Sequence, residues 1–321
     1  MANLLARAAE SVFWLARYME RVENLARILD VTETFSRDRG GRNWLSVVQI
    51  NADDRSFFDK HTTASATNVL DFYLLDTDNP TSIQVSILAA HQNARALRPL
   101  ISIEMWAQIN VLYHRLRQLT ATDIAAPKLS KLCSEIREAC QAHAGIVEGT
   151  FYRDEAWYFY WLGKQIERAD QSTRLLDIKY HLLLPSADDV GSALDLSQWN
   201  AVLQAAAGYQ AFRRLHPGRM TPKMMAGFLL FCDSYPRSVL PCVRQVEWLL
   251  AQLRARYRLS GASAAMERLD EMRVAMTDNS IEQILAKGLH EFLDWLQSEL
   301  GEVAADIAQS FFADCPFEVS A

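Results

Sequence analysis

The amino-acid sequence predicts an all-helical protein, and three observations favour this fold class. The chain has 321 residues but only 12 glycines and 9 prolines, about half of what average usage would give. Apolar residues recur at helical spacing along most of the chain, and no alternating apolar–polar run is long enough to predict a sheet. The length allows one large domain or two closely packed halves.

The first predicted element is a long helix at the start of the chain. Apolar side chains from Leu4 to Leu29 fall on one broad stripe at i, i+3 and i+4 spacing, as on the buried face of a helix. We therefore expect one helix over residues 3–36, ended by Gly40 and Gly41.

The segment 37–66 has a different composition. It contains Gly-Gly, Asp-Asp and Thr-Thr pairs and one short apolar piece, Trp44 to Ile50. We expect a long connection there with one or two short helices. Helical spacing then predicts further helices over 66–76, 80–98, 102–121, 127–149 and 152–183, a linker at 185–195, and helices over 196–214, 221–233, 236–257, 262–277 and 280–313.

Four prolines are expected to lie at helix starts. A proline is tolerated at the first position of a helix because the N–H that it lacks would have no partner there. These prolines are Pro80, Pro127, Pro222 and Pro236.

The charge balance excludes one broad class of partner. Lys and Arg number 33 against 39 Asp and Glu, so the formal net charge is −6. This balance argues against a nucleic-acid-binding protein dominated by a basic surface. The longest strongly apolar run, Met224 to Cys232, is too short to span a membrane, so we expect neither nucleic acid nor membrane as a partner.

The expected compartment is the cytoplasm. Arg7, Glu10 and Arg17 interrupt the start of the chain, which therefore lacks the uncharged core of a signal peptide. The five cysteines form no Cys-x-x-Cys pair, and we interpret them as reduced thiols.

The most informative feature is an internal duplication. Phe13 to Val31 reads FWLARYMERVENLARILDV, and Tyr160 to Ile178 reads YWLGKQIERADQSTRLLDI. At a constant offset of 147 the two stretches share seven of nineteen residues without a gap. Helical composition alone hardly explains this agreement.

A second, weaker repeat relates NPTSI, residues 79–83, to YPRSV, residues 235–239. Each opens a predicted helix. Together the two repeats predict a pseudo-symmetric helical bundle of two related halves, residues 1–150 and 151–321, because a solenoid would show three or more shorter units.

Charged residues of each long repeat fill one continuous arc of a helical wheel. In the first repeat Glu23 and Arg27 form an i, i+4 pair, which on an exposed helix would contribute about 0.2–0.5 kcal/mol. That is too little to explain why both repeats carry the whole arrangement. The candidate residues are Arg17, Glu20, Arg21, Glu23, Arg27 and Asp30 in the first arc, and Lys164, Glu167, Arg168, Asp170, Arg174 and Asp177 in the second.

Three interpretations of these arcs remain open. They could be solvated helix faces, or a buried network of ion pairs that fixes the register of the two halves. They could also line a shared site in which arginine side chains hold a carboxylate or phosphate in two-pronged fashion.

Other motifs that carry chemistry are missing from the sequence. It has no Glu-x-x-His, the pair on which di-iron bundles rely, and its seven histidines show no metal-ligand spacing. It also lacks Gly-x-x-x-x-Gly-Lys-Ser/Thr, Gly-x-Gly-x-x-Gly and Gly-x-Ser-x-Gly, the patterns of phosphate-binding loops and of a common hydrolase site. We therefore expect no metal site and no bound cofactor.

The two Glu-Arg repeats give the chain a recognisable likeness. SVFWLARYMERVENLARILDV and YFYWLGKQIERADQSTRLLDIKYHLLLP, together with NPTSI, YPRSV and ISIEMWAQIN, resemble the alpha-E family, bacterial all-helical proteins named for a Glu-Arg motif. The likeness extends over nearly the whole chain. At Ala90 and His91 it departs from the Arg-Glu pair expected there.

The resemblance implies a partnership. Alpha-E proteins are typically encoded beside, or fused to, a circularly permuted ATP-grasp protein, and often near a transglutaminase-like peptidase. This setting implies ATP-dependent formation of an amide or peptide bond, and it assigns no catalytic role to the alpha-E protein itself. We therefore expect a non-catalytic helical partner or substrate-positioning subunit of an ATP-grasp ligase. The alternative is an enzyme or a small-ligand-binding module whose site is the paired Glu-Arg motifs.

Overall fold

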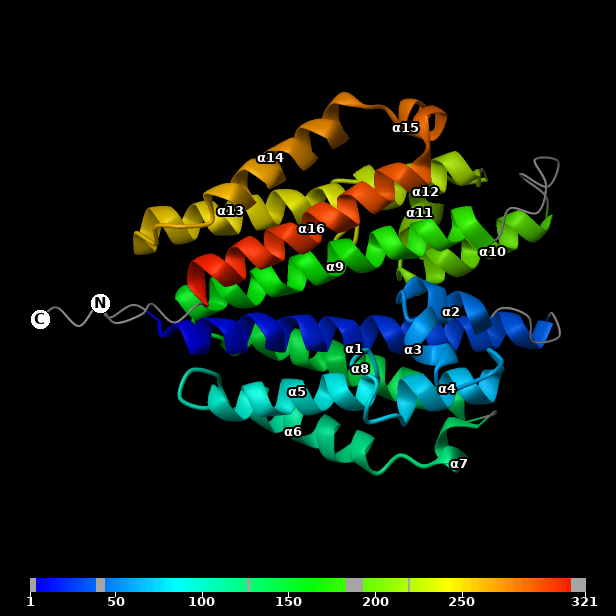
Figure 1. Cartoon of the computed structure of the whole chain (residues 1–321), viewed down its shortest axis with the longest axis horizontal. Coiled ribbons are helices and arrows are strands. Elements are labelled where there is room, and N and C mark those ends of the chain that lie inside the picture. The colour runs from blue at the N-terminus through cyan, green and yellow to red at the C-terminus, as the bar shows by residue number, and fades with distance from the viewer. Residues whose placement is uncertain (1–3, 39–43, 126–127, 183–192, 219, 313–321) are drawn as a thin grey trace, which may run out of the picture.

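Two long helices lie side by side at the centre of the molecule. They are α1 (Ala6–Asp38) and α9 (Glu155–Leu182), and they run through the middle of the bundle in Figure 1. Within the described residues every regular element is a helix, so the predicted fold class is confirmed. The computed structural model describes residues 4–38, 44–125, 128–182, 193–218 and 220–312.

The other long helices form two groups, one on each side of this central pair (Figure 1). In the first group α5 (Ile83–Ala96) and α8 (Leu129–Thr150) pack on α1, and α6 (Ile103–Arg117) packs on these two helices. In the second group α13 (Val239–Tyr257) and α16 (Leu289–Phe311) pack on α9, and α14 (Ser263–Asp278) packs on these two helices. A pseudo-twofold relation between the halves 1–150 and 151–321 stays a prediction.

Short helices gather at the end of the bundle that lies opposite the start of α1 and the end of α16 (Figure 1). They are α2 (Trp44–Ile50), α3 (Asp54–Phe58), α4 (Ala66–Leu74), α7 (Ala121–Ile124), α10 (Ala193–Ala205), α11 (Tyr209–Leu215), α12 (Pro222–Phe231) and α15 (Ile281–Lys287). The one or two short helices expected within 37–66 are thus α2 and α3. The expected helix end at Gly40–Gly41 and the linker residues 185–192 lie outside the described residues.

The single helix predicted over 196–214 is wrong, because the chain breaks into α10 and α11. Ala207 has a positive φ of 63°, which no helix can contain. The side chain of Tyr235 fixes this turn, since its hydroxyl donates to the Ala206 carbonyl oxygen at 2.5 Å. Helix α10 also begins at Ala193, within the predicted linker.

The helix predicted over 280–313 is also wrong, because it divides into α15 and α16. Gly288 separates them with a φ of 121°, a conformation that favours glycine. Helical spacing cannot reveal such a break when the apolar pattern continues in phase on both sides.

The prediction that four prolines begin helices is confirmed for one proline and wrong for two. Pro222 is the first residue of α12, as predicted. Pro80 precedes α5, whose cap is Ser82: its side chain accepts a hydrogen bond from the Val85 N–H at 3.1 Å. Pro236 likewise precedes Ser238, the residue before α13. Pro127 lies outside the described residues.

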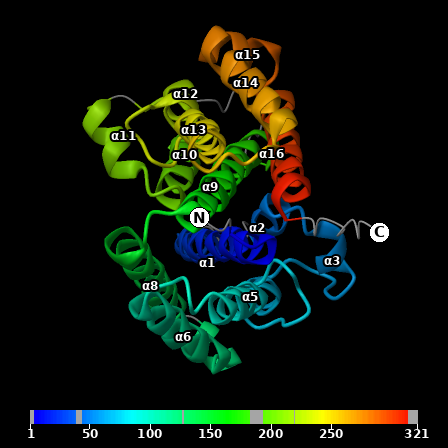
Figure 2. The same ribbon diagram turned by 90° about the vertical axis from the view of Figure 1, so that its left-hand side faces the viewer.

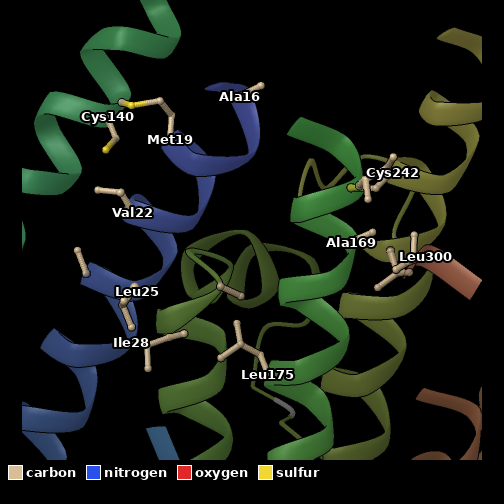
Figure 3. Close-up of a cluster of buried hydrophobic side chains, with 14 of the residues drawn as sticks. Ala16, Met19, Val22, Leu25, Ile28, Cys140, Ala169, Leu175, Cys242 and Leu300 are labelled. Atoms are coloured by element: carbon tan, nitrogen blue, oxygen red, sulfur yellow. The ribbon is translucent and has the colours of Figure 1, made fainter. Parts of the chain in front are cut away.

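Close contact between α1 and α9 depends on a small residue. A Cβ added to Gly163 of α9 would overlap the carbonyl oxygen of Phe13 and lie 3.0 Å from its carbonyl carbon. Glycine therefore allows the two backbones to approach. Apolar clusters flank the pair on both sides: Figure 3 shows Met19 of α1 beside Cys140 of α8, while Ala169 of α9 lies near Cys242 of α13.

Candidate functional site

The Glu-Arg dipeptides of α1 and α9 bind one another crosswise. Glu20 accepts hydrogen bonds from Arg168, at 2.9 Å from Nε and 3.1 Å from Nη2. Glu167 accepts the reciprocal pair from Arg21, at 2.8 Å from Nε and 3.1 Å from Nη2. Each carboxylate is therefore held by two nitrogens of one guanidinium group, the strongest common geometry for such a pair.

Each carboxylate also receives a second arginine. Arg17 donates from Nε to Glu167 at 2.8 Å, and Arg237 donates from Nη1 to Glu20 at 2.6 Å. Both glutamate side chains are almost completely buried, at 2% and 1% exposure for Glu20 and Glu167. Two carboxylates and four guanidinium groups thus form two buried clusters, Glu20 with Arg168 and Arg237, and Glu167 with Arg17 and Arg21. We call these two clusters together the Glu-Arg network.

Arg237 is a member of this network that sequence analysis missed. It precedes α13 and binds two further groups of α1, with Nη1 2.8 Å from Asn24 Oδ1 and Nη2 3.0 Å from Glu23 Oε1. A signal was present in the weaker repeat YPRSV. Its counterpart in NPTSI is Thr81, which donates to Asp53 at 2.5 Å, so the two copies differ here.

The remaining predicted residues pair locally or with outer helices. Arg27 donates to Glu23 at 2.6 Å and Arg174 to Asp170 at 2.8 Å, each within its own helix. Beyond them, Asp30 accepts from Arg137 of α8 at 2.9 Å. None of these contacts joins one central helix to the other.

Asp177 belongs to a separate cluster at the start of α16. The two ring nitrogens of His290 face different carboxylates, with Nδ1 2.7 Å from Asp177 and Nε2 3.2 Å from Asp294. Among the described His, Cys, Asp and Glu residues, these three form the group that lies close enough together to hold a metal ion. Each ring nitrogen thus has a carboxylate as its partner.

The electrostatics keep the network fully charged at neutral pH. Burial opposes ionisation of Glu167, yet Arg21 and Arg17 hold the pKa of its carboxyl at about 2. Burial opposes ionisation of Glu20 as well, and Arg168 and Arg237 hold its pKa well below the usual range. A carboxylate with so low a pKa is a poor general base at neutral pH.

Comparison with known proteins identifies the family. A family model named Alpha-E, described as a predicted alpha-helical domain with a conserved ER motif, matches residues 4–312. The chain belongs to the Alpha-E family. The family description names an ER motif, which is a Glu-Arg dipeptide. Two Glu-Arg dipeptides of this chain form the crosswise pairs.

Curated relatives of this Alpha-E chain come from mycobacteria. It is 25% identical over 328 residues to an uncharacterized protein of Mycobacterium bovis and to one of Mycobacterium tuberculosis, a match that covers 95% of the chain and 35% of each relative. The chain therefore spans about a third of the length of these relatives. No solved structure matches it significantly. None of the described helices is both long and apolar enough to cross a membrane.

Not every Glu-Arg dipeptide of this Alpha-E chain takes part in the network. Glu267-Arg268 lies on α14, where Arg268 is 34% exposed and pairs with Glu299 and Asp306 of α16 at 2.9 and 3.2 Å. The dipeptide alone therefore predicts little. What distinguishes Glu20-Arg21 and Glu167-Arg168 is the central position of their helices.

The position equivalent to Arg17 in the second repeat is Lys164, and it behaves differently. In the described part of the chain Lys164 forms no direct ion pair, and its amine lies 5.0 Å from the centre of the Trp161 ring. Lys164 lines a cavity of about 10 Å³ together with Glu20, Tyr160 and His143, a space for about one water molecule. Burial lowers the pKa of the Lys164 amine more than Glu20 raises it.

Neutral groups complete the wall of this cavity. Burial lowers the pKa of His143 to about 3. Its Nε2 lies 3.2 Å from the Tyr160 hydroxyl, and its Nδ1 is buried without a hydrogen-bond partner. Burial also raises the pKa of the Cys140 thiol well above its usual value. No motif in the sequence connects these residues with the Glu-Arg network.

The departure at Ala90 and His91 lies on α5, away from the network's contacts. Ala90 is completely buried. His91 stacks on Tyr113 of α6, with ring centres 4.1 Å apart, and its Nε2 lies 3.0 Å from Asn110 Oδ1. In this chain the segment therefore packs α5 on α6 through rings and an amide.

Proposed function

We propose that this Alpha-E chain is a non-catalytic helical partner or substrate-positioning subunit of a circularly permuted ATP-grasp ligase that forms amide or peptide bonds. A transglutaminase-like peptidase is the second proposed partner. The ligase would supply the nucleotide site and the chemistry, and the Alpha-E chain a rigid helical body against which ligase or substrate is placed.

One observation carries the non-catalytic part of this proposal. The Glu-Arg groups bind each other, with Glu20 held by Arg168 and Glu167 held by Arg21. A substrate could reach these carboxylates only after displacing guanidinium groups from a buried network. Within the described residues, the cavity beside Glu20 holds about one water, which leaves no room for an amino acid or a nucleotide.

The relatives support the partner role. In the mycobacterial proteins the matching stretch is 35% of the chain, so the helical body there is joined to other segments. A domain that works beside others can act through its surface, with its charged core devoted to holding the helices together.

The test is reconstitution with the full-length ATP-grasp ligase of the same organism. We expect the two proteins to co-purify, and the ligase to form its product more slowly when the Alpha-E chain is left out. Full ligase rate without the chain, together with no complex at micromolar concentrations, would contradict the proposal.

A second candidate is a binding module that uses the Glu20 side of the network. Lys164 and His143 favour it, since both are buried residues that line a small cavity and His143 Nδ1 has no hydrogen-bond partner. A ligand would raise the melting temperature by mass action. Because the cavity has room for about one water, the ligand would be a small ion. A thermal-shift screen with chloride and ammonium salts decides: a saturable rise that Lys164→Met abolishes supports binding, and flat curves contradict it.

A further inference from the structure

One end of the bundle brings together turns that are far apart in the sequence. Figure 2 looks onto this end, where the start of α1, the turn between α5 and α6, and the turn between α8 and α9 all lie. The Ser102 hydroxyl is 2.8 Å from the Thr150 hydroxyl, and the Leu4 N–H donates to the Glu155 carboxylate at 2.5 Å. These contacts place the three segments side by side.

The most exposed large apolar side chains of the described residues are at this end. Ile103 is 82% exposed, and Leu5 and Tyr152 are each 78% exposed. Leu100, in the same turn as Ile103, adds a fourth at 37%. Single exposed apolar residues are ordinary, but several that gather on one face are typical of an interaction site.

Two tryptophans extend this surface, and each is covered by an arginine. The Arg98 guanidinium lies 5.4 Å from the centre of the Trp106 ring, and the Arg153 guanidinium lies 5.6 Å from the Trp157 ring. Both tryptophans are half-buried. Tryptophan, tyrosine and arginine are the residues most enriched among those that dominate protein–protein binding energy. We call this surface the end face, defined by Leu5, Leu100, Ile103, Trp106, Tyr152 and Trp157.

The position of the chain ends indicates what covers the end face. Leu4 and Phe312 are the first and last described residues, and Figure 1 shows the start of α1 and the end of α16 on this side. In the mycobacterial relatives the matching stretch is only 35% of the protein. The rest of such a chain must continue from one of these two ends, and so begins beside the end face.

We propose that the end face is the docking surface for a second protein, one that presents apolar side chains and accepts hydrogen bonds from Arg98 and Arg153. This inference deepens the proposed function and rests on it: the end face is where the ligase binds. The carbonyl and carboxylate oxygens of a partner could accept hydrogen bonds from Arg98, and could share Arg153 with Glu148, whose carboxylate lies 2.7 Å from it, while the rings become buried.

The experiment compares two double variants in binding to the full-length ligase. Ile103→Lys with Tyr152→Lys places two charges on the end face, whereas Val111→Lys with Leu285→Lys changes two exposed apolar residues elsewhere, at 65% and 39% exposure. All four side chains are exposed, so both variants should keep the melting temperature of the wild type. We expect the end-face variant to bind at least about tenfold more weakly, which is about 1.4 kcal/mol, and the other variant to bind like the wild type.

Three other outcomes would overturn the inference. If both variants bind like the wild type, the end face is not used while the partner role stands. If the wild-type chain itself does not bind the ligase, both the proposed function and the proposed docking surface are wrong. If the end-face variant changes only self-association in sedimentation experiments, the occupant is a second copy of this chain.

Discussion

The equivalent residues Arg17 and Lys164 have different surroundings, although the repeats align without a gap. Arg17 donates to Glu167, whereas Lys164 lies beside a cavity and forms no direct ion pair among the described residues. The second arginine that binds Glu20, besides Arg168, is Arg237. Two copies of one helix can thus share a charge pattern and still build unlike surroundings.

This difference predicts unequal effects of removing the two cations. Arg17→Met should lower the free energy of unfolding by about 1.5–3 kcal/mol, the usual range for a hydrogen bond to a charged group. Lys164→Met should change it by less than about 1 kcal/mol, because burial already disfavours the charged amine. Urea denaturation at neutral pH measures both, and equal losses would contradict the asymmetry.

The pKa of Glu167 predicts how stability depends on pH. In the folded protein it lies at about 2, below the ordinary 4.5. A lowered pKa contributes stability that is complete above the ordinary value and is lost as the pH falls towards the folded value. We therefore expect the free energy of unfolding to decrease between pH 4.5 and about 2.

Glu167→Gln removes this contribution and should make that part of the curve less steep, while Glu20, whose pKa is also lowered, keeps part of the slope. Glu104→Gln, at an exposed position in the first turn of α6, serves as the matched control and should leave the slope unchanged. A wild-type protein whose stability stayed constant over this range would show that Glu167 is not held as an ion.

At the scale of the helices, the packing of α1 on α9 depends on Gly163. Gly163→Ala should destabilise the protein by about 1–3 kcal/mol, the usual cost of overpacking, because the new methyl group meets the Phe13 backbone. Gly145→Ala on α8 meets nothing within 4 Å and should stabilise by about 0.5–1 kcal/mol. Thermal melts that moved in the same direction for both would contradict this role.

The long helices were predictable because each buries an apolar stripe with a 3.6-residue period. The breaks within the predicted helices 196–214 and 280–313 were not predictable in this way. The turn between α10 and α11 is set by Tyr235, which reaches back to the Ala206 carbonyl oxygen from a distant part of the chain. Glycine at 288 was visible in the sequence, but only its φ of 121° shows that the helix stops there.

At the scale of the whole molecule, the duplicated motif pointed to the residues that meet, but not to how they meet. Glu20 and Arg168 are 148 positions apart, and sequence spacing carries no information about such a crosswise exchange. Arg237 and the cavity beside Lys164 depend on α13 and α8 packing around the central pair. The likeness to the Alpha-E family was recognisable because it rests on short motifs, whereas the end face depends on loops that meet only in the fold.

The central claim is that the Glu-Arg motif acts between helices and not within its own dipeptide. Double-mutant cycles test it most directly, using urea denaturation of Glu20→Gln combined with Arg168→Met and, separately, with Arg21→Met. We predict a coupling energy of about 2–3 kcal/mol for the crosswise pair and less than about 0.5 kcal/mol for the neighbours in sequence. Negligible coupling between Glu20 and Arg168, or a larger one between Glu20 and Arg21, would contradict the account.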